Sequence, residues 1–307
     1  MTSTQTLTFF QLLLEIATSS RRSFVGYHFT GEANLRAPML RAMLVAHQET
    51  FPFDSDTNRF RIAPGEALQF SDCDFSHGTL IGWDLEEAQL VRTDLRHATL
   101  RNCVLRRCTF EKCSGYQVSI DDACILEETR FTACDLTRAH IGGTWQGCTL
   151  KDCTLLSSTA HVATFRDSCF TASTLSGSTL FASNFPGTQF VACEWKQIDI
   201  WGCDFKLAQF TNIREIIGGI LLEDAILGEA SPQEKALRQM AAYYVQHNQG
   251  PCWGGFIRTF ASYPGMLAWA YQVLSPYACL KEHLESYKEC TPAGERALIE
   301  QWEQQKA

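Results

Sequence analysis

Large apolar residues return at every fifth position along the central part of the chain, beginning at Phe70. An α-helix has a period of about 3.6 residues and a flat strand a period of two, so neither keeps this spacing on one face. A coil with four sides of about five residues does, because each side then carries one inward residue at its centre. The pattern therefore predicts a stack of four-sided coils. The first run consists of Phe70, Phe75, Leu80, Leu85, Leu90, Leu95, Leu100, Leu105 and Phe110.

The same period continues to Leu227, but its phase changes three times, the last time before the shifted pair Leu222 and Leu227. Four apolar residues come one position late, and the first phase returns at Leu150. We expect interruptions of the coil at 114–125, where Gly115 replaces a central residue, at 142–149 and near 211–219. Self-similarity of this length at a fixed period is typical of solenoid proteins. The late group is Leu126, Phe131, Leu136 and Ile141.

The central residues should form a buried ladder through the stack. No single coil buries its own apolar face, so only stacking builds a continuous core. The open ends of such a rod expose backbone groups and apolar side chains, and they need caps. The residues that we assign to the structural ladder include Phe75, Leu85, Leu95, Leu105, Phe131, Phe165, Phe170, Leu175, Phe185 and Phe205.

This pattern resembles the pentapeptide repeat family, with its A-(D/N)-L-x-x consensus, over about residues 66–227. The resemblance implies a mainly β fold, a right-handed quadrilateral parallel β-helix. We expect residues 1–60 to hold an N-terminal helical cap and a candidate first coil, since Ala33-Asn34-Leu35 matches the consensus. The β-helix should occupy 61–230, and a C-terminal α-helical bundle should occupy 231–307.

The two ends of the chain carry helical patterns rather than the five-residue period. Phe9, Phe10, Leu13, Ile16 and Ala17 lie at helical spacing, which predicts a short helix over residues 4–18 that caps the first coil. Near the other end, Ser231-Pro232-x-Glu234 has the residues of a helix start. The aromatic residues of the C-terminal part, Trp253 and Trp269 among them, have two interpretations: the core of the bundle, or a surface that contacts a partner.

The cysteines follow the repeat, which favours a packing role. Ten of the 14 occupy the small position two residues before a central residue, where a thiol acts as a slightly larger alanine. The chain has no C-x-x-C pair, so we expect free buried thiols, neither disulfides nor zinc. Free thiols fit a reducing compartment and predict a cytoplasmic protein. A Ser/Thr-rich start resembles type III export signals, which would mean secretion into a host cell.

The formal net charge of −8 lies within residues 61–230, which hold 22 acidic and 14 basic side chains. The basic footprint of a protein that binds nucleic acid directly is absent. No run reaches the roughly 18 apolar residues of a membrane span. The best-known activity of the family that the chain resembles is gyrase and topoisomerase binding by DNA mimicry, often as a homodimer. A mimic needs one sign of charge along a face, yet stacking places Glu86 and Glu87 beside Arg106 and Arg107.

The sequence contains no nucleophile motif, phosphate-binding loop or metal-ligand motif. We therefore expect no enzymatic activity, no catalytic or metal-binding residue and no cofactor. Some type III effectors join such a β-helix to a ubiquitin-ligase lobe with a catalytic cysteine, but the C-terminal 77 residues that contain Cys290 are too few for that lobe. The densest acidic surface is the first change of phase, and we take it as the candidate contact site. Its residues are Asp121, Asp122, Glu127, Glu128 and Asp135.

The leading interpretation is a non-enzymatic bacterial scaffold that binds another protein of unknown identity. Two alternatives stay open on the sequence alone. One is a DNA mimic that binds gyrase or another topoisomerase. The other is a secreted type III effector that binds a host protein.

Overall fold

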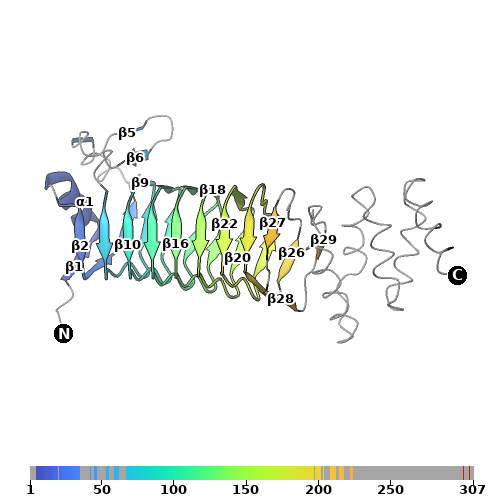
Figure 1. Ribbon diagram of the computed structural model, residues 1–307. Coiled ribbons are helices and arrows are strands. Elements are labelled where there is room, and N and C mark those ends of the chain that lie inside the picture. The colour runs from blue at the N-terminus through green and yellow to red at the C-terminus, as the bar shows by residue number, and fades with distance from the viewer. Residues whose placement is uncertain are drawn as a thin grey trace.

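The computed structural model describes residues 5–19, 21–34, 67–196 and 198–201, together with shorter pieces. These residues form a long rod of stacked coils with helix α1 (Phe9–Thr18) at its N-terminal end (Figure 1). Except for residues 300 and 304, the C-terminal bundle predicted over 231–307 lies outside the described residues. The shorter pieces are 42, 45–46, 53–54, 59–61, 203, 208–211, 214–217, 222–223, 300 and 304.

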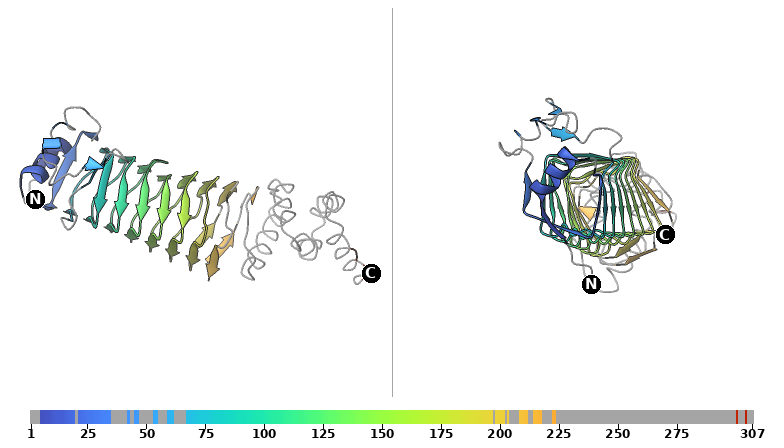
Figure 2. Two further views of the ribbon diagram at one scale, coloured as in Figure 1. Left: turned by 90° about the horizontal axis from the view of Figure 1, so that it is seen from above. Right: turned by 90° about the vertical axis from the view of Figure 1, so that its left-hand side faces the viewer.

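Each coil crosses four sides of the rod in a constant order, so the rod seen end-on is a square tube (Figure 2). Sides 1 and 3 are parallel sheets of nine strands each. Side 1 consists of β2 (Ser23–Val25), β7 (Gln69–Ser71), β10 (Gln89–Val91), β13 (Thr109–Glu111), β16 (Arg130–Thr132), β19 (Thr149–Lys151), β22 (Cys169–Thr171), β24 (Gln189–Val191) and β27 (Gln209–Thr211). Side 3 consists of β4 (Glu32–Asn34), β8 (Thr79–Ile81), β11 (Thr99–Arg101), β14 (Ser119–Ile120), β17 (His140–Ile141), β20 (Thr159–His161), β23 (Thr179–Phe181), β26 (Asp199–Trp201) and β29 (Leu222–Glu223).

The other two sides are less regular. On side 4, β5 (Phe53–Asp54) pairs antiparallel with β6 (Arg59–Arg61), and the remaining strands are parallel. They are β9 (Trp83–Glu86), β12 (Val104–Arg106), β15 (Ile125–Glu127), β18 (Thr144–Gln146) and β21 (Thr164–Arg166). On side 2, isolated parallel β-bridges join residues of successive coils, in a series that begins at His28 and ends at Glu194. Its end strands are β1 (Gln5–Thr8) and β3 (Tyr27–Thr30) before these bridges, and β25 (Glu194–Lys196) and β28 (Arg214–Ile217) after them.

The five-residue period arises because equivalent residues of successive coils pair in register. Leu90 lies opposite Phe70 on one side and Phe110 on the other. Every central residue therefore stacks on its counterpart at the inter-strand spacing of about 4.8 Å. The prediction of a mainly β parallel solenoid is confirmed.

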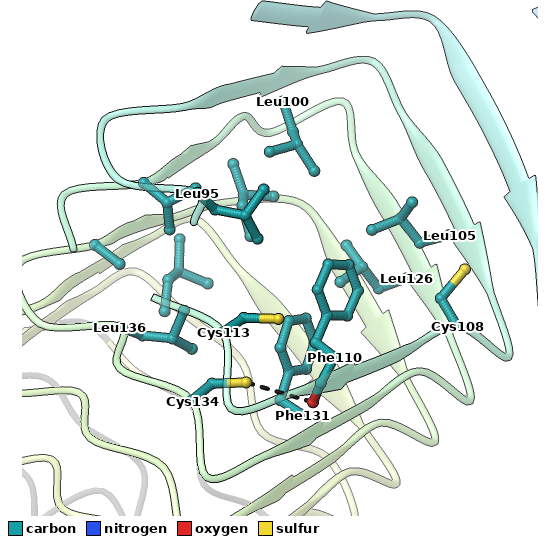
Figure 3. Close-up of a cluster of buried hydrophobic side chains, with 14 of the residues drawn as sticks. Leu95, Leu100, Leu105, Cys108, Phe110, Cys113, Leu126, Phe131, Cys134 and Leu136 are labelled. Carbon is teal, nitrogen blue, oxygen red and sulfur yellow. Dashed lines mark hydrogen bonds between the residues drawn. The ribbon is translucent and has the colours of Figure 1, made fainter. Parts of the chain in front are cut away.

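The interior is a continuous column of apolar side chains (Figure 3). The rings of Phe110 and Phe131 stack with centroids 4.6 Å apart, and Leu105 pairs with Leu126 on the next side. Phe205 lies outside the described residues. The other nine assigned ladder residues are buried: Phe75, Leu85, Leu95, Leu105, Phe131, Phe165, Phe170, Leu175 and Phe185.

The small positions two residues before the central ones hold free, buried thiols. Each thiol donates to a backbone carbonyl of the preceding coil: Sγ of Cys134 lies 3.4 Å from the oxygen of Phe110 (Figure 3). Burial raises the pKa of Cys108 and of Cys148 to about 12, and that of Cys193 to about 11. These cysteines therefore stay protonated and pack as apolar residues.

The N-terminal helix is shorter than its predicted range. Residues 5–8 form β1, and Thr8 starts the helix through a capping box in which its hydroxyl accepts from the Gln11 amide. Phe9 packs against Phe29 and Phe75 of the first coils, with ring centroids 6.0 and 5.8 Å apart. The predicted apolar stripe was wrong at Phe10, which is 41% exposed, whereas the buried stripe includes Leu12. The role of this helix as a cap stays a prediction.

Candidate protein-contact surface

Two irregular turns lie on top of each other at the corner between sides 3 and 4. In one coil, six positions separate the central residues Ile120 and Leu126, and in the next coil only four separate Ile141 and Trp145. The extra residue and the missing residue cancel over the two coils. Phe110, Phe131 and Leu150 pair in register on side 1, at sequence separations of 21 (131 − 110) and 19 (150 − 131) residues. This arrangement explains the first two changes of phase in the sequence.

The first two predicted interruptions were too wide. The coil is regular through strand β14, and the irregular turn begins only after Ile120. The second interruption contains strand β18, whose central residue Trp145 is fully buried and donates from Nε1 to the carbonyl of Gly142 at 2.9 Å. Trp145 is thus a ladder residue that the sequence analysis missed, because the glycine-containing stretch 142–149 predicted an interruption, although Trp145 lies five positions before Leu150 and in its phase.

The acidic pair at this corner has two different roles. Oδ1 of Asp121 accepts from the amides of Asn102 and Ala123, at 3.0 and 3.2 Å, so this carboxylate holds the longer turn together. Asp122 is exposed, and its carboxylate lies directly over Gly142, where a Cβ atom would overlap Oδ1. Asp122 is therefore the member of the pair that is available to a partner.

The acidic residues of side 4 pair with basic residues of the neighbouring coil. Arg106 lies between Asp84 and Glu127, with nitrogen–oxygen distances of 2.6 and 3.1 Å. Burial lowers the pKa of Arg106, but the hydrogen bonds and charges of these two carboxylates outweigh burial and raise it. Arg107 pairs in the same way with Glu86 and Glu87. Side 4 is thus a column of alternating charge.

The proposed acidic contact site is not one cluster. Asp122 and Glu128 are exposed at opposite ends of side 4, while Asp135 lies on side 2, where its carboxylate accepts from the amide of Thr137 at 3.0 Å. Trp253 and Trp269 lie outside the described residues.

A different exposed surface lies on side 3, in the C-terminal half of the rod. The rings of His161 and Phe181 stack with centroids 5.1 Å apart and planes at 7°. Phe181 is 41% exposed, and the adjoining Val162 is 52% exposed. We call these three residues the side 3 patch. The backbone of Trp201 continues the column, in register with Phe181. The sequence signal for this patch is an aromatic residue one position after successive central residues.

Two kinds of feature, a metal-binding cluster and a membrane-spanning helix, are absent from the described residues. Within them, no three His, Cys, Asp or Glu side chains are grouped so as to hold a metal ion. No helix among them has the length and hydropathy of a membrane span.

The repeated coils have a counterpart among known families. Residues 69–113 match the family model for pentapeptide repeats, in eight copies. The chain carries pentapeptide repeats. None of the curated proteins matches it.

Several solved structures of pentapeptide repeat and related proteins are similar to this chain. QnrB1, a plasmid-mediated fluoroquinolone resistance protein, is 15% identical over 55% of this chain and 86% of its own, with a TM-score of 0.43. HetL, involved in heterocyst differentiation regulation in the cyanobacterium Nostoc sp. strain PCC 7120, is 18% identical over 54% and 80%, with a TM-score of 0.25. Rfr23 from the cyanobacterium Cyanothece 51142 is 13% identical over 48% and 89%, with a TM-score of 0.19. All three TM-scores lie below 0.5.

Proposed function

We propose that the chain is a non-enzymatic scaffold that binds another protein along the outer surface of its rod. The observation that carries this proposal is the side 3 patch. Phe181 and Val162 point outward from a rod whose interior is already filled, so their exposure contributes nothing to the core. Exposed apolar clusters of this kind are characteristic of protein-binding surfaces.

The backbone beneath the patch supports the same proposal. Strands β20 and β23 pair in register, and the small residues beneath them, Ser158 and Ser178, are buried and hydrogen-bonded to each other at 3.1 Å. The patch is therefore held by a regular sheet rather than by a loop. A preformed surface of this kind loses little conformational entropy when a partner binds.

The charge distribution disfavours DNA mimicry, the main alternative. Arg92 forms two hydrogen bonds with Asp72, both 2.7 Å long, and Arg107 pairs with Glu86 and Glu87. Neighbouring opposite charges cancel each other's field at a distance. The ion-paired sides of the rod lack the continuous negative field that a topoisomerase would read as a DNA backbone.

The scaffold proposal can be tested by affinity capture from a lysate of the source organism, with the full-length chain and two variants as bait. Phe181→Ser removes the side 3 patch, and Leu156→Ser is the matched control because Leu156 is 40% exposed on side 2. We expect a protein that the wild type and Leu156→Ser retain and that Phe181→Ser loses. If quantitative mass spectrometry finds the same proteins on all three baits, the patch is not the binding surface.

A further inference from the structure

The side 3 patch adjoins an acidic group along the axis of the rod. Asp121, Gly142, His161 and Phe181 occupy the same position of side 3 in four successive coils. Gly142 has no side chain, and the carboxylate of Asp122 lies over it instead. The order along this column is therefore carboxylate, imidazole and phenyl ring, at successive steps of about 4.8 Å.

Asp122 differs from the other acidic residues near it. Glu127 is paired with Arg106, and Asp121 is bound by backbone amides. Among the described residues, no ion pair within 4.0 Å joins Asp122 to a basic group. The carboxylate is exposed and directed over the backbone of the column that carries His161.

We propose that this column binds a segment of another protein that carries both an apolar and a basic residue. Its apolar side chain packs on Phe181 and Val162, and its Lys or Arg pairs with Asp122. Two coils separate Gly142 from Phe181, a distance of about 10 Å. An extended chain covers that distance in about three residues, so the two side chains lie within about four positions of each other. This inference rests on the proposed function and names the chemistry of the partner.

The arrangement favours a protein segment over a nucleic acid or a second DNA-like surface. A carboxylate at one end of the column repels phosphate and attracts Lys or Arg. A Lys or Arg without an apolar neighbour would bind other exposed carboxylates equally well. Selective binding at this column therefore requires both the carboxylate and the apolar end. Buried aromatic contacts supply most of the affinity, and the charge pair adds selectivity.

The test uses a phage-displayed library of random 12-residue peptides selected on the full-length chain. Enriched peptides are then synthesised, and their binding is measured by fluorescence anisotropy against the wild type, Phe181→Ser, Val162→Ser and Asp122→Asn. We expect an aromatic or aliphatic residue within about four positions of a Lys or Arg. Phe181→Ser should weaken binding at least about tenfold. Asp122→Asn should weaken it about threefold to tenfold and reduce its salt dependence.

The possible failures are distinguishable. Peptides that depend on Phe181 but are neutral or acidic, or that bind Asp122→Asn as well as the wild type, overturn the inference and leave the scaffold proposal standing. Binding that is unchanged in both Phe181→Ser and Val162→Ser removes the patch itself and both proposals with it. Sedimentation that shows a wild-type dimer and a Phe181→Ser monomer makes a second copy the occupant and also overturns the inference. Circular dichroism melting of each variant confirms that it is folded.

Discussion

Replacing Gly143 with alanine should destabilise the rod much more than the same change at Gly147, the next corner of the same coil. Both glycines have positive φ, +79° and +62°. The left-handed backbone costs an alanine about 1–2 kcal/mol. The lower entropy of the unfolded alanine chain returns about 0.4–1 kcal/mol of that. Since Ala133 occupies another corner of the rod at φ 52°, this part of the cost is tolerated by the fold.

The two positions differ in what a new Cβ atom would meet. At Gly147 the nearest atom is Cγ of Glu128 at 3.5 Å, an ordinary contact, so we expect a loss of about 0–1.5 kcal/mol. At Gly143 the Cβ atom would overlap the carbonyl oxygen of Cys124, which accepts from the amide of Thr144 at 2.9 Å. Displacing that carbonyl adds about 1–3 kcal/mol of overpacking and about 1 kcal/mol for the hydrogen bond. The total for Gly143→Ala is about 2–5 kcal/mol.

Urea denaturation followed by far-ultraviolet circular dichroism measures the difference. The comparison requires equal m-values in the two variants and the wild type, because a solenoid can unfold in parts. We expect a clearly lower midpoint for Gly143→Ala than for Gly147→Ala. Equal midpoints would show that overlap with the Cys124 carbonyl is not the reason why position 143 requires a glycine.

Three further predictions concern the core, the thiols and the charged surface. Phe170→Ala should lower the free energy of unfolding by about 3–5 kcal/mol, since the stacked ring of Phe190 cannot fill the space, whereas the exposed Arg166→Ala should change it by less than about 0.5 kcal/mol in the same urea assay. Burial raises the pKa of Cys108 to about 12 and that of Cys193 to about 11 from the ordinary 9.0, so their contribution to stability is complete below pH 9 and is lost as pH rises from 9 through 11–12; the urea midpoint should fall over that range, and less so in Cys108→Ala. An alkaline loss identical in wild type and Cys108→Ala would contradict this assignment. Purified gyrase should supercoil DNA at an unchanged rate in the presence of the chain, and inhibition that salt abolishes would restore the DNA-mimic alternative.

The sequence predicted the repeating interior well because the interior obeys one simple rule. A residue such as Phe170 is buried by its position in the coil, whatever lies outside it. The rule fails at a corner where the number of residues between two sides of the coil changes. Trp145 sits at the centre of side 4 because the corner at Gly142 and Gly143 is one residue short. Its five-residue spacing from Leu150 fits this position, but the glycines around it predicted an interruption of the coil instead.

The candidate site was harder to predict for a related reason. Nearness in sequence grouped Asp121 with Glu127, but a coil places residues five positions apart on different sides or at different corners. Contacts on the surface join residues about 20 positions apart, as His161 and Phe181 show. Reading the sequence in columns reveals such pairs. It does not reveal that Asp122 lies over Gly142, because that depends on the path of a six-residue turn.

The paired corners at Asp122 and Gly142 resemble two dislocations of opposite sign in a crystal. One alone moves every later central residue by one position in the sequence, as it does for Leu126, Phe131, Leu136 and Ile141, which are nevertheless buried. Together they restore the original sequence phase at Leu150, while Phe110, Phe131 and Leu150 stay in register throughout. A solenoid can therefore acquire a local irregularity, with new side chains in new directions, without altering the lattice on either side. The corner between sides 3 and 4 is a place where this rod varies its surface independently of its core.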